Sequence, residues 1–290
     1  MVTFPLLQLP LVAMENVLCM MSPFELGDGM SWTYLMTKNG NGLPRRYIHR
    51  VDDFYTNEQI IMFTKKPLKD LKNWFEYVKE VLNCKIDSVT LDLDCPSSEN
   101  RQAIDWIASQ NKTLDYAEIK NNRRESDDDL RYFMERLHVT GVFNLMVKKY
   151  KADFRIEIPV KPERLHIGNS RFVNYDLLLR LKSPDIVLRK SILTNEEINR
   201  FLKSWMSYEI HLELEAIRIN GSGPDAMNEI MNLPHEKTND PEIVEAFKGD
   251  PHHIQVENKI FTIKRCDGKK KASVTVAGFL NDWRFCLIVH

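Results

Sequence analysis

The amino-acid sequence predicts an α/β protein with a short apolar helical segment, an irregular strand–helix domain and a C-terminal antiparallel β cap. Three observations predict this architecture. The first 26 residues are unusually apolar, strand and helix patterns alternate from residue 87 to residue 219, and the hairpin signal Asp267-Gly268 lies between two alternating segments. A chain of 290 residues is long enough for one large domain or two ordinary ones.

The N-terminal segment has the pattern of a short helix that is apolar on nearly every side. Pro10 suits its first turn, where no backbone N–H is needed. Apolar residues then follow at spacings of three and four, namely Met14, Val17, Leu18 and Met21. Such a helix must be covered, either by the rest of this chain or by another protein.

A connector and a helix follow this segment. Residues 38–46 have the Asn, Gly and Pro content of a loop, and residues 47–51 and 59–63 could be short strands. Residues 67–82 carry apolar side chains at helical spacing. We therefore predict four parts, with boundaries at residues 4–36, 37–66, 67–221 and 222–290.

Strands and helices alternate through the main domain. Strands are predicted at residues 88–93, 114–119, 141–147, 154–158, 164–167, 185–188 and 215–219, and helices at 99–109, 127–137, 174–181 and 194–206. Equivalent strand positions, 20 to 30 residues apart, are Leu91, Ile119, Leu145, Ile167, Val187 and Ile217. This period predicts a solenoid of the leucine-rich-repeat type, and an open layered α/β sheet is the alternative.

The last part is predicted to cap the repeats. Proline and glycine punctuate residues 221–253, where two short helices are expected near 226–231 and 242–247. Strands follow at residues 253–256, 260–264, 272–276 and 285–289. An antiparallel cap would cover the core face that a terminal repeat otherwise exposes.

We expect an intracellular location, in the cytoplasm or nucleus. Net charge is −1, so nothing calls for nucleic acid or an anionic membrane as a partner. No apolar run reaches the roughly 20 residues of a membrane helix. The cysteines are odd in number and form no CxxC pair, which predicts reduced thiols at Cys19, Cys84, Cys95, Cys266 and Cys286.

Two groups of residues have the side-chain types found in metal-binding or catalytic sites. His211, Glu213 and Glu215 share one face if they form a strand, and they are metal-ligand types. Asp92 and Asp94 also share a face and could act as an acid/base pair. A solvated strand face explains each set more simply. No phosphate-binding loop or nucleophile motif is present, so we expect no catalytic residues, metal, cofactor or enzyme activity.

Charged runs have equally plain explanations. Lys264-Arg265 and Lys269-Lys270-Lys271 fit a charge-protected hairpin, although they could touch nucleic acid or acidic partners. Asp127-Asp128-Asp129 fits the acidic first turn of a helix.

A family resemblance starts in the N-terminal segment. Phe4-Pro5-Leu6-Leu7-Gln8-Leu9-Pro10 and Met20-Met21-Ser22-Pro23-Phe24-Glu25-Leu26 resemble the opening of a large nematode family of F-box proteins. In that family a type-2 F-box-associated domain follows the F-box. The resemblance continues at residues 168–173 and 193–205.

The resemblance implies a substrate-recognition subunit of an SCF-type ubiquitin ligase. It implies that the N-terminal segment binds a Skp-type adaptor, and through it a cullin, while the C-terminal domain binds an unknown target protein. The positions matching the adaptor-binding half are Leu7, Leu9, Pro10, Val17, Leu18, Met21, Pro23, Phe24 and Leu26.

The sequence departs from the family pattern after this first half. Gly27-Asp28-Gly29 and the glycines of residues 39–42 interrupt the region where the family continues its helix. Each glycine weakens a helix interior by about 1 kcal/mol relative to alanine. The second half is therefore expected to be shortened or rebuilt, and a non-catalytic interaction module that has lost adaptor binding is the alternative function.

Overall fold

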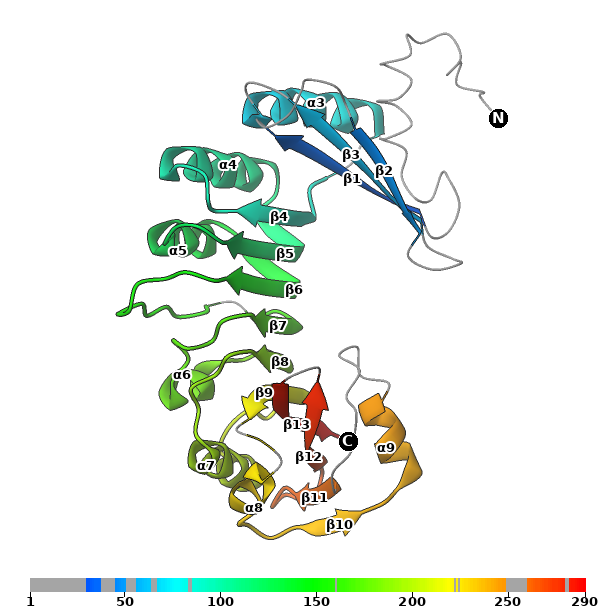
Figure 1. Ribbon diagram of the computed structural model, residues 1–290, viewed down its shortest axis with the longest axis vertical. Helices are drawn as coiled ribbons and strands as arrows, with labels where there is room; N and C mark the ends of the chain where they lie inside the picture. Colours follow the sequence, from blue (N-terminus) through cyan, green and yellow to red (C-terminus); the bar gives the residue numbers. More distant parts are fainter. Residues whose placement is uncertain are drawn as a thin grey trace. The chain divides into compact units, whose positions relative to one another are not determined.

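The computed structural model describes residues 30–37, 45–50, 56–63, 67–82, 85–159, 161–221, 223, 225–248, 260–279 and 282–290. The chain divides into two compact units after Lys85. The described residues form a mixed α/β structure with seven helices, one three-stranded sheet and one ten-stranded sheet (Figure 1). The helix expected within residues 4–26 lies outside the described residues.

The first unit contains the three-stranded sheet and one helix. Its elements are β1 (Met30–Thr37), β2 (Arg45–Arg50), β3 (Thr56–Phe63) and α3 (Pro67–Leu82). The central strand, β3, pairs in parallel with β1 and antiparallel with β2. The sequence predicted two of these strands and the helix but not β1, whose Trp32, Thr33 and Tyr34 are residue types that favour strands.

The second unit begins with six parallel strands in the order of the chain. They are β4 (Ser88–Asp92), β5 (Thr113–Asn121), β6 (His138–Val147), β7 (Arg164–Ile167), β8 (Asp185–Leu188) and β9 (Ala216–Gly221). Each strand pairs with the one before it in sequence.

Helices cover one face of these strands (Figure 1). They are α4 (Ser97–Gln110), α5 (Asp127–Arg136), α6 (Tyr175–Arg180) and α7 (Asn195–Met206). Thr194 accepts from the backbone of Glu197, whose side chain accepts from the Thr194 backbone, and this capping box starts α7 as the sequence predicted.

The connection from β6 to β7 corrects one prediction. Residues 154–158 form no strand. Phe154, Ile156 and Ile158 are nevertheless buried, and the residues between them are exposed. The alternating pattern therefore marks an irregular segment that covers the core where a helix lies in the other connections.

The core lies between the strands and the helices. Pairing brings Leu91, Ile119, Leu145 and Ile167 into one row, as the sequence predicted, and all but the half-buried Leu91 are nearly inaccessible to solvent. Burial of each such side chain contributes about 1.5–3 kcal/mol. The row continues through Leu188 and Ile219, so the predicted equivalents Val187 and Ile217 were wrong. Ile186, Val187 and Leu188 are all apolar, and this run hides the alternation that would fix the register.

The C-terminal part extends the sheet with antiparallel strands, which confirms the predicted cap. Its elements are α8 (Ala226–Ile230), β10 (Glu236–Thr238), α9 (Pro241–Lys248), β11 (Ile260–Lys264), β12 (Lys271–Phe279) and β13 (Asp282–Val289). The final strand, β13, lies between β9 and β12, and β11 and β10 follow outward. The strand expected at residues 253–256 lies outside the described residues.

Candidate functional site

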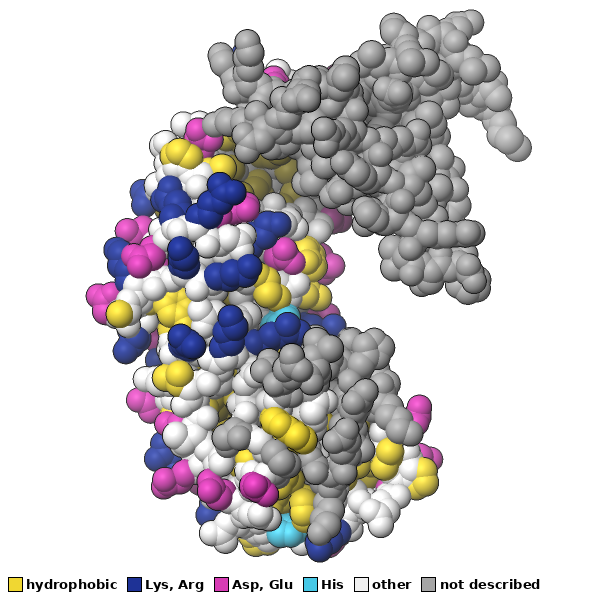
Figure 2. Space-filling view, in the orientation of Figure 1, with side chains coloured by type: hydrophobic (Ala, Val, Ile, Leu, Met, Phe, Trp, Pro, Cys, Tyr) yellow, Lys and Arg dark blue, Asp and Glu magenta, His cyan; other side chains and the backbone are white. Residues whose placement is uncertain are grey.

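Basic residues occupy the turns that leave the carboxyl ends of β5, β6, β7 and β8. We call this set the basic edge, and it consists of Arg123, Arg124, Lys148, Lys149, Lys151, Arg171, Arg189 and Lys190. Parallel neighbouring strands lie about 4.8 Å apart, so their carboxyl ends bring these turns side by side. Lys and Arg side chains gather on the visible face of this unit over its parallel strands and helices (Figure 2).

Asp94 anchors the first of these turns. Its carboxylate accepts hydrogen bonds from the backbone amides of residues 122–124, at 2.9–3.3 Å. Desolvation pushes the pKa of Asp94 upward, but these backbone hydrogen bonds outweigh it and hold the pKa below its ordinary value. Asp94 therefore holds the turn that presents Arg123. Asp92 accepts from the Asp94 backbone at 3.0 Å, so both carboxylates are engaged in turn structure.

Asn121 ties the first turn to the second. The side chain of Asn121 is buried, and its amide donates to the carbonyls of Arg124 at 2.9 Å and Lys149 at 2.8 Å. Its oxygen accepts from the backbone amides of Lys148 at 2.8 Å and Lys149 at 3.0 Å. One side chain thus forms hydrogen bonds with four backbone groups of two successive turns, and the Lys148 amide also donates to the Asn121 backbone carbonyl at 3.4 Å.

Similar hydrogen bonds connect the remaining turns. The Asn169 amide donates to the Lys148 carbonyl at 3.1 Å, and the Ser170 hydroxyl donates to the Arg189 carbonyl at 2.8 Å. Asn220 accepts from the backbone amide of Lys190 at 2.9 Å. The turns therefore form one continuous hydrogen-bonded row.

Few carboxylates offset the charge of this row. Asp127 and Asp129 are buried at the start of α5; Asp127 accepts from the Lys151 backbone at 3.1 Å, and Asp129 accepts from Asn100 at 2.7 Å. Within the turns, the exposed carboxylates are Glu125 and Asp153. Arg124 pairs with Asp129 at 3.6 Å, which leaves seven basic residues and two exposed carboxylates in the turns of a chain whose net charge is −1. The edge is a local concentration of positive charge.

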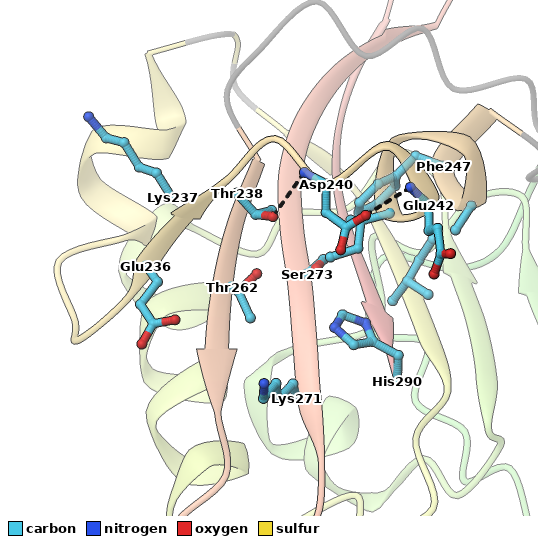
Figure 3. Close-up of a pocket in the computed structure, with 13 residues that line it drawn as sticks. Glu236, Lys237, Thr238, Asp240, Glu242, Phe247, Thr262, Lys271, Ser273 and His290 are labelled. Atoms are coloured by element: carbon cyan, nitrogen blue, oxygen red, sulfur yellow. Dashed lines mark hydrogen bonds between the residues drawn. The ribbon is translucent and has the colours of Figure 1, made fainter.

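A groove of about 450 Å³ lies between α9 and the C-terminal strands (Figure 3). Lys271, Ser273 and His290 contribute to its lining. Burial and the nearby Lys271 charge lower the pKa of His290. Asp240 also lines the groove, and its carboxylate accepts from the Glu242 backbone at 3.0 Å and so caps α9.

A second cavity, of about 590 Å³, lies beside the predicted metal-ligand residues. Residues 211–215 form a turn, not a strand, so the expected common face of His211, Glu213 and Glu215 is wrong. His211 has a φ of 48°, and its Nε2 donates to the Leu178 carbonyl at 2.9 Å. Glu213 pairs with Lys161, and Glu215 is exposed. Among the described residues, His, Cys, Asp and Glu side chains form no group of three that could hold a metal ion.

The predicted charged runs have structural partners. Arg265 pairs with Asp267 at 2.8 Å and stacks on Tyr208 at 4.5 Å, and Lys264 pairs with Glu236 at 2.6 Å. The nine predicted adaptor-binding residues all lie outside the described part of the chain.

The sequence patterns did not predict the basic edge. Its signal was a basic residue or pair directly after successive predicted strands, at residues 123–124, 148–149, 171 and 189–190. Each pair alone resembles an ordinary solvated turn, and only the parallel stacking of the strands brings the pairs together.

Comparison with known proteins gives one match. A family model described as F-box associated matches residues 153–219, which confirms the predicted F-box-associated domain for that segment. The matched segment contains β7, β8, most of β9, the second cavity and part of the basic edge, including Arg171 and Lys190. No curated protein and no solved structure matches the chain. Within the described residues, every helix is too short or too polar to span a membrane.

Proposed function

We propose that this protein is a substrate-recognition subunit of an SCF-type ubiquitin ligase, related to the nematode F-box proteins. The observation that carries the proposal is the F-box-associated match at residues 153–219, downstream of an N-terminal segment with the opening pattern of an F-box. In this proposal the N-terminal segment binds a Skp-type adaptor, and through it a cullin. The second unit binds a target protein.

The proposed receptor is not an enzyme and works by proximity. Tethering a target beside a ligase raises its effective concentration there, which requires two binding surfaces and no catalytic group. The protein would act in the cytoplasm or nucleus. We further propose that the second unit is an irregular leucine-rich-repeat-like array, because its parallel strands pair in sequence order and its helices share one face.

The F-box of this proposal is short. The strand β1 begins at Met30, so any helical F-box segment must end before it. The same observation favours a second candidate function, a non-catalytic interaction module that has lost adaptor binding. The proposed domain boundaries remain residues 4–36, 37–66, 67–221 and 222–290.

Co-purification with a Skp-type adaptor tests the proposal. The wild-type chain should capture the adaptor, and the double variant L9D/V17D should not, because buried carboxylates would disrupt an apolar interface. The control is I192D, which introduces one carboxylate at an exposed position of the second unit and should retain capture. Absence of capture by the wild type would favour the second candidate, and persistence in L9D/V17D would exclude the proposed adaptor-binding face.

A further inference from the structure

We propose that the basic edge binds an acidic segment of the target protein, a stretch of Asp and Glu residues lying in extended conformation across the turns that follow β5 to β8. The inference rests on the proposed function for the identity of the partner as a ligase target. The binding chemistry itself rests only on the second unit.

Exposed basic side chains give this edge the charge that an acidic segment would recognise. Arg123, Lys148, Lys149, Arg171 and Lys190 are exposed, and the described residues form no ion pair with any of them. A patch of one sign on a nearly neutral chain raises the rate of association with an oppositely charged partner and excludes partners of the same sign.

Side-chain hydrogen bonds hold the backbone of these turns in place. Asp94, Asn121, Asn169, Ser170 and Asn220 hold the backbone of successive turns by the hydrogen bonds described above. The cations therefore project from fixed backbone positions before a partner arrives. Binding to a preorganised surface avoids the cost of ordering loops.

The last turn supplies two further features. Lys190 has a φ of 53°, a left-handed conformation that costs a non-glycine residue about 1 kcal/mol. Two residues later, Ile192 is 56% exposed and is one of three large apolar side chains that the described residues leave exposed. A strained cation beside an exposed apolar side chain fits a partner that places an apolar residue next to its acidic stretch.

The dimensions fit a short extended segment. Four neighbouring strands at about 4.8 Å spacing place the first and last basic turns about 14 Å apart, which an extended chain spans in about five residues. Nucleic acid fits less well, because single strands bind through exposed aromatic rings. The aromatic residues near these turns are covered: Tyr150 is half-buried, and Phe154 and Phe172, whose rings lie 5.3 Å and 5.5 Å from it, are buried.

Fluorescence anisotropy with the full chain tests this inference. The probe is a fluorescein-labelled peptide of about twelve residues that alternates Glu and Gly, long enough to cross all four turns. The controls are a Gln-Gly peptide of the same length and a single-stranded RNA. We expect binding to the Glu-Gly peptide alone, with an affinity that falls as salt is raised.

Charge-reversal variants locate the site. The variant K148E/K190E should lower affinity for the Glu-Gly peptide at least about tenfold, and I192A should leave it within about twofold because this probe has no apolar residue. The matched control K112E/K203E reverses two exposed lysines away from the edge and should also stay within about twofold. Equal losses in K148E/K190E and K112E/K203E, no peptide binding by the wild type, or tighter binding of RNA would overturn the inference.

Adaptor capture by the same variants separates the two proposals. Capture depends on residues 4–26, so K148E/K190E should capture the adaptor as the wild type does. Capture without peptide binding would refute the acidic-segment inference alone. Peptide binding without capture would refute the ligase role and leave the basic edge intact as a binding surface.

Discussion

The two edges of the parallel sheet use their charges differently. At the amino edge, Asp185 accepts from Arg164 at 2.7 Å and from Arg218 at 2.5 Å, and Glu157 pairs with Arg180 at 2.7 Å. At the carboxyl edge, asparagine, serine and aspartate side chains hold the backbone instead, and most cations face solvent. Charged side chains therefore pair with one another at the amino edge, whereas most of those at the carboxyl edge are exposed to solvent.

The largest expected effect lies at the amino edge. The substitution D185A leaves Arg164 and Arg218 together without the carboxylate between them, and the Arg218 side chain is only 6% exposed. We expect the free energy of unfolding to fall by about 3 kcal/mol, because the substitution removes a carboxylate that contacts two guanidinium groups, one of them buried. Urea denaturation measures this change. The control E213A removes an exposed pair and should cost less than about 1 kcal/mol; equal costs would contradict the buried role of Asp185.

The next effect tests how the carboxyl edge is held. The substitution N121A removes four hydrogen bonds between one buried side chain and the backbone of two turns, and we expect the free energy of unfolding to fall by about 2 kcal/mol. The same variant should bind the Glu-Gly peptide more weakly, because its turns are less ordered. The neighbouring N122A removes an exposed side chain and should change stability by less than about 0.5 kcal/mol. Unchanged peptide affinity in a destabilised N121A would show that rigidity is unimportant for binding.

The free energy of unfolding should depend on pH through two histidines near the amino edge, His211 and His290. Burial lowers the pKa of His211, despite the opposing hydrogen bond to the Leu178 carbonyl, and burial also lowers the pKa of His290. The unfolded chain then binds more protons than the folded chain just below the ordinary histidine pKa of about 6.5. Stability is complete above that pH and falls as the pH drops through it toward the folded pKa values.

Thermal melting at pH 7.5 and at pH 5.5 measures this dependence. The variant H211Q keeps a donor for the Leu178 carbonyl but has no ionisable ring, so the difference between its two melting temperatures should be smaller than in the wild type. The exposed residue His138 provides the control, and H138Q should retain the wild-type difference. A pH dependence unchanged in H211Q would assign the effect to other groups.

The smallest expected effect is at Lys190, where one substitution should raise stability and weaken peptide binding. The substitution K190G should raise the free energy of unfolding by about 0.5–1 kcal/mol, because glycine adopts the left-handed conformation without strain. The same change should weaken binding of the Glu-Gly peptide. The control K190A removes the charge but keeps the strain, so it should weaken binding without stabilising the fold. Stabilisation by K190A would show that the backbone conformation is not the source of the gain.

The sequence predicted the repeating strand–helix core well because the core depends on local patterns. The Thr194–Glu197 capping box and the Asp267-Gly268 turn carry their own chemistry within a few residues. The predictions failed where local patterns were ambiguous. Val187 lies in a wholly apolar run, and β10 has only three residues, too few to show a period.

The candidate site was predictable only in part, for a different reason. Arg123, Lys149 and Lys190 are far apart in sequence, and their proximity depends on the pairing of four strands. The prediction for His211 was wrong for a local reason. Residues 211–215 form a turn, in which His211 has a left-handed backbone conformation, and not the strand that would have aligned it with Glu213. Spacing alone identifies residues on one element, whereas this edge is assembled from several.

The position of β13 has a consequence for synthesis. β13 follows every other strand of its sheet in sequence, yet it is flanked by β9 and β12, and its Phe285 and Leu287 are fully buried. A nascent chain that has not yet released residues 282–289 from the ribosome therefore exposes two unpaired strand edges, a state prone to aggregation. Completion of this fold is a late event, and a nonsense mutation that removes β13 would leave the cap strands without their link to the parallel core.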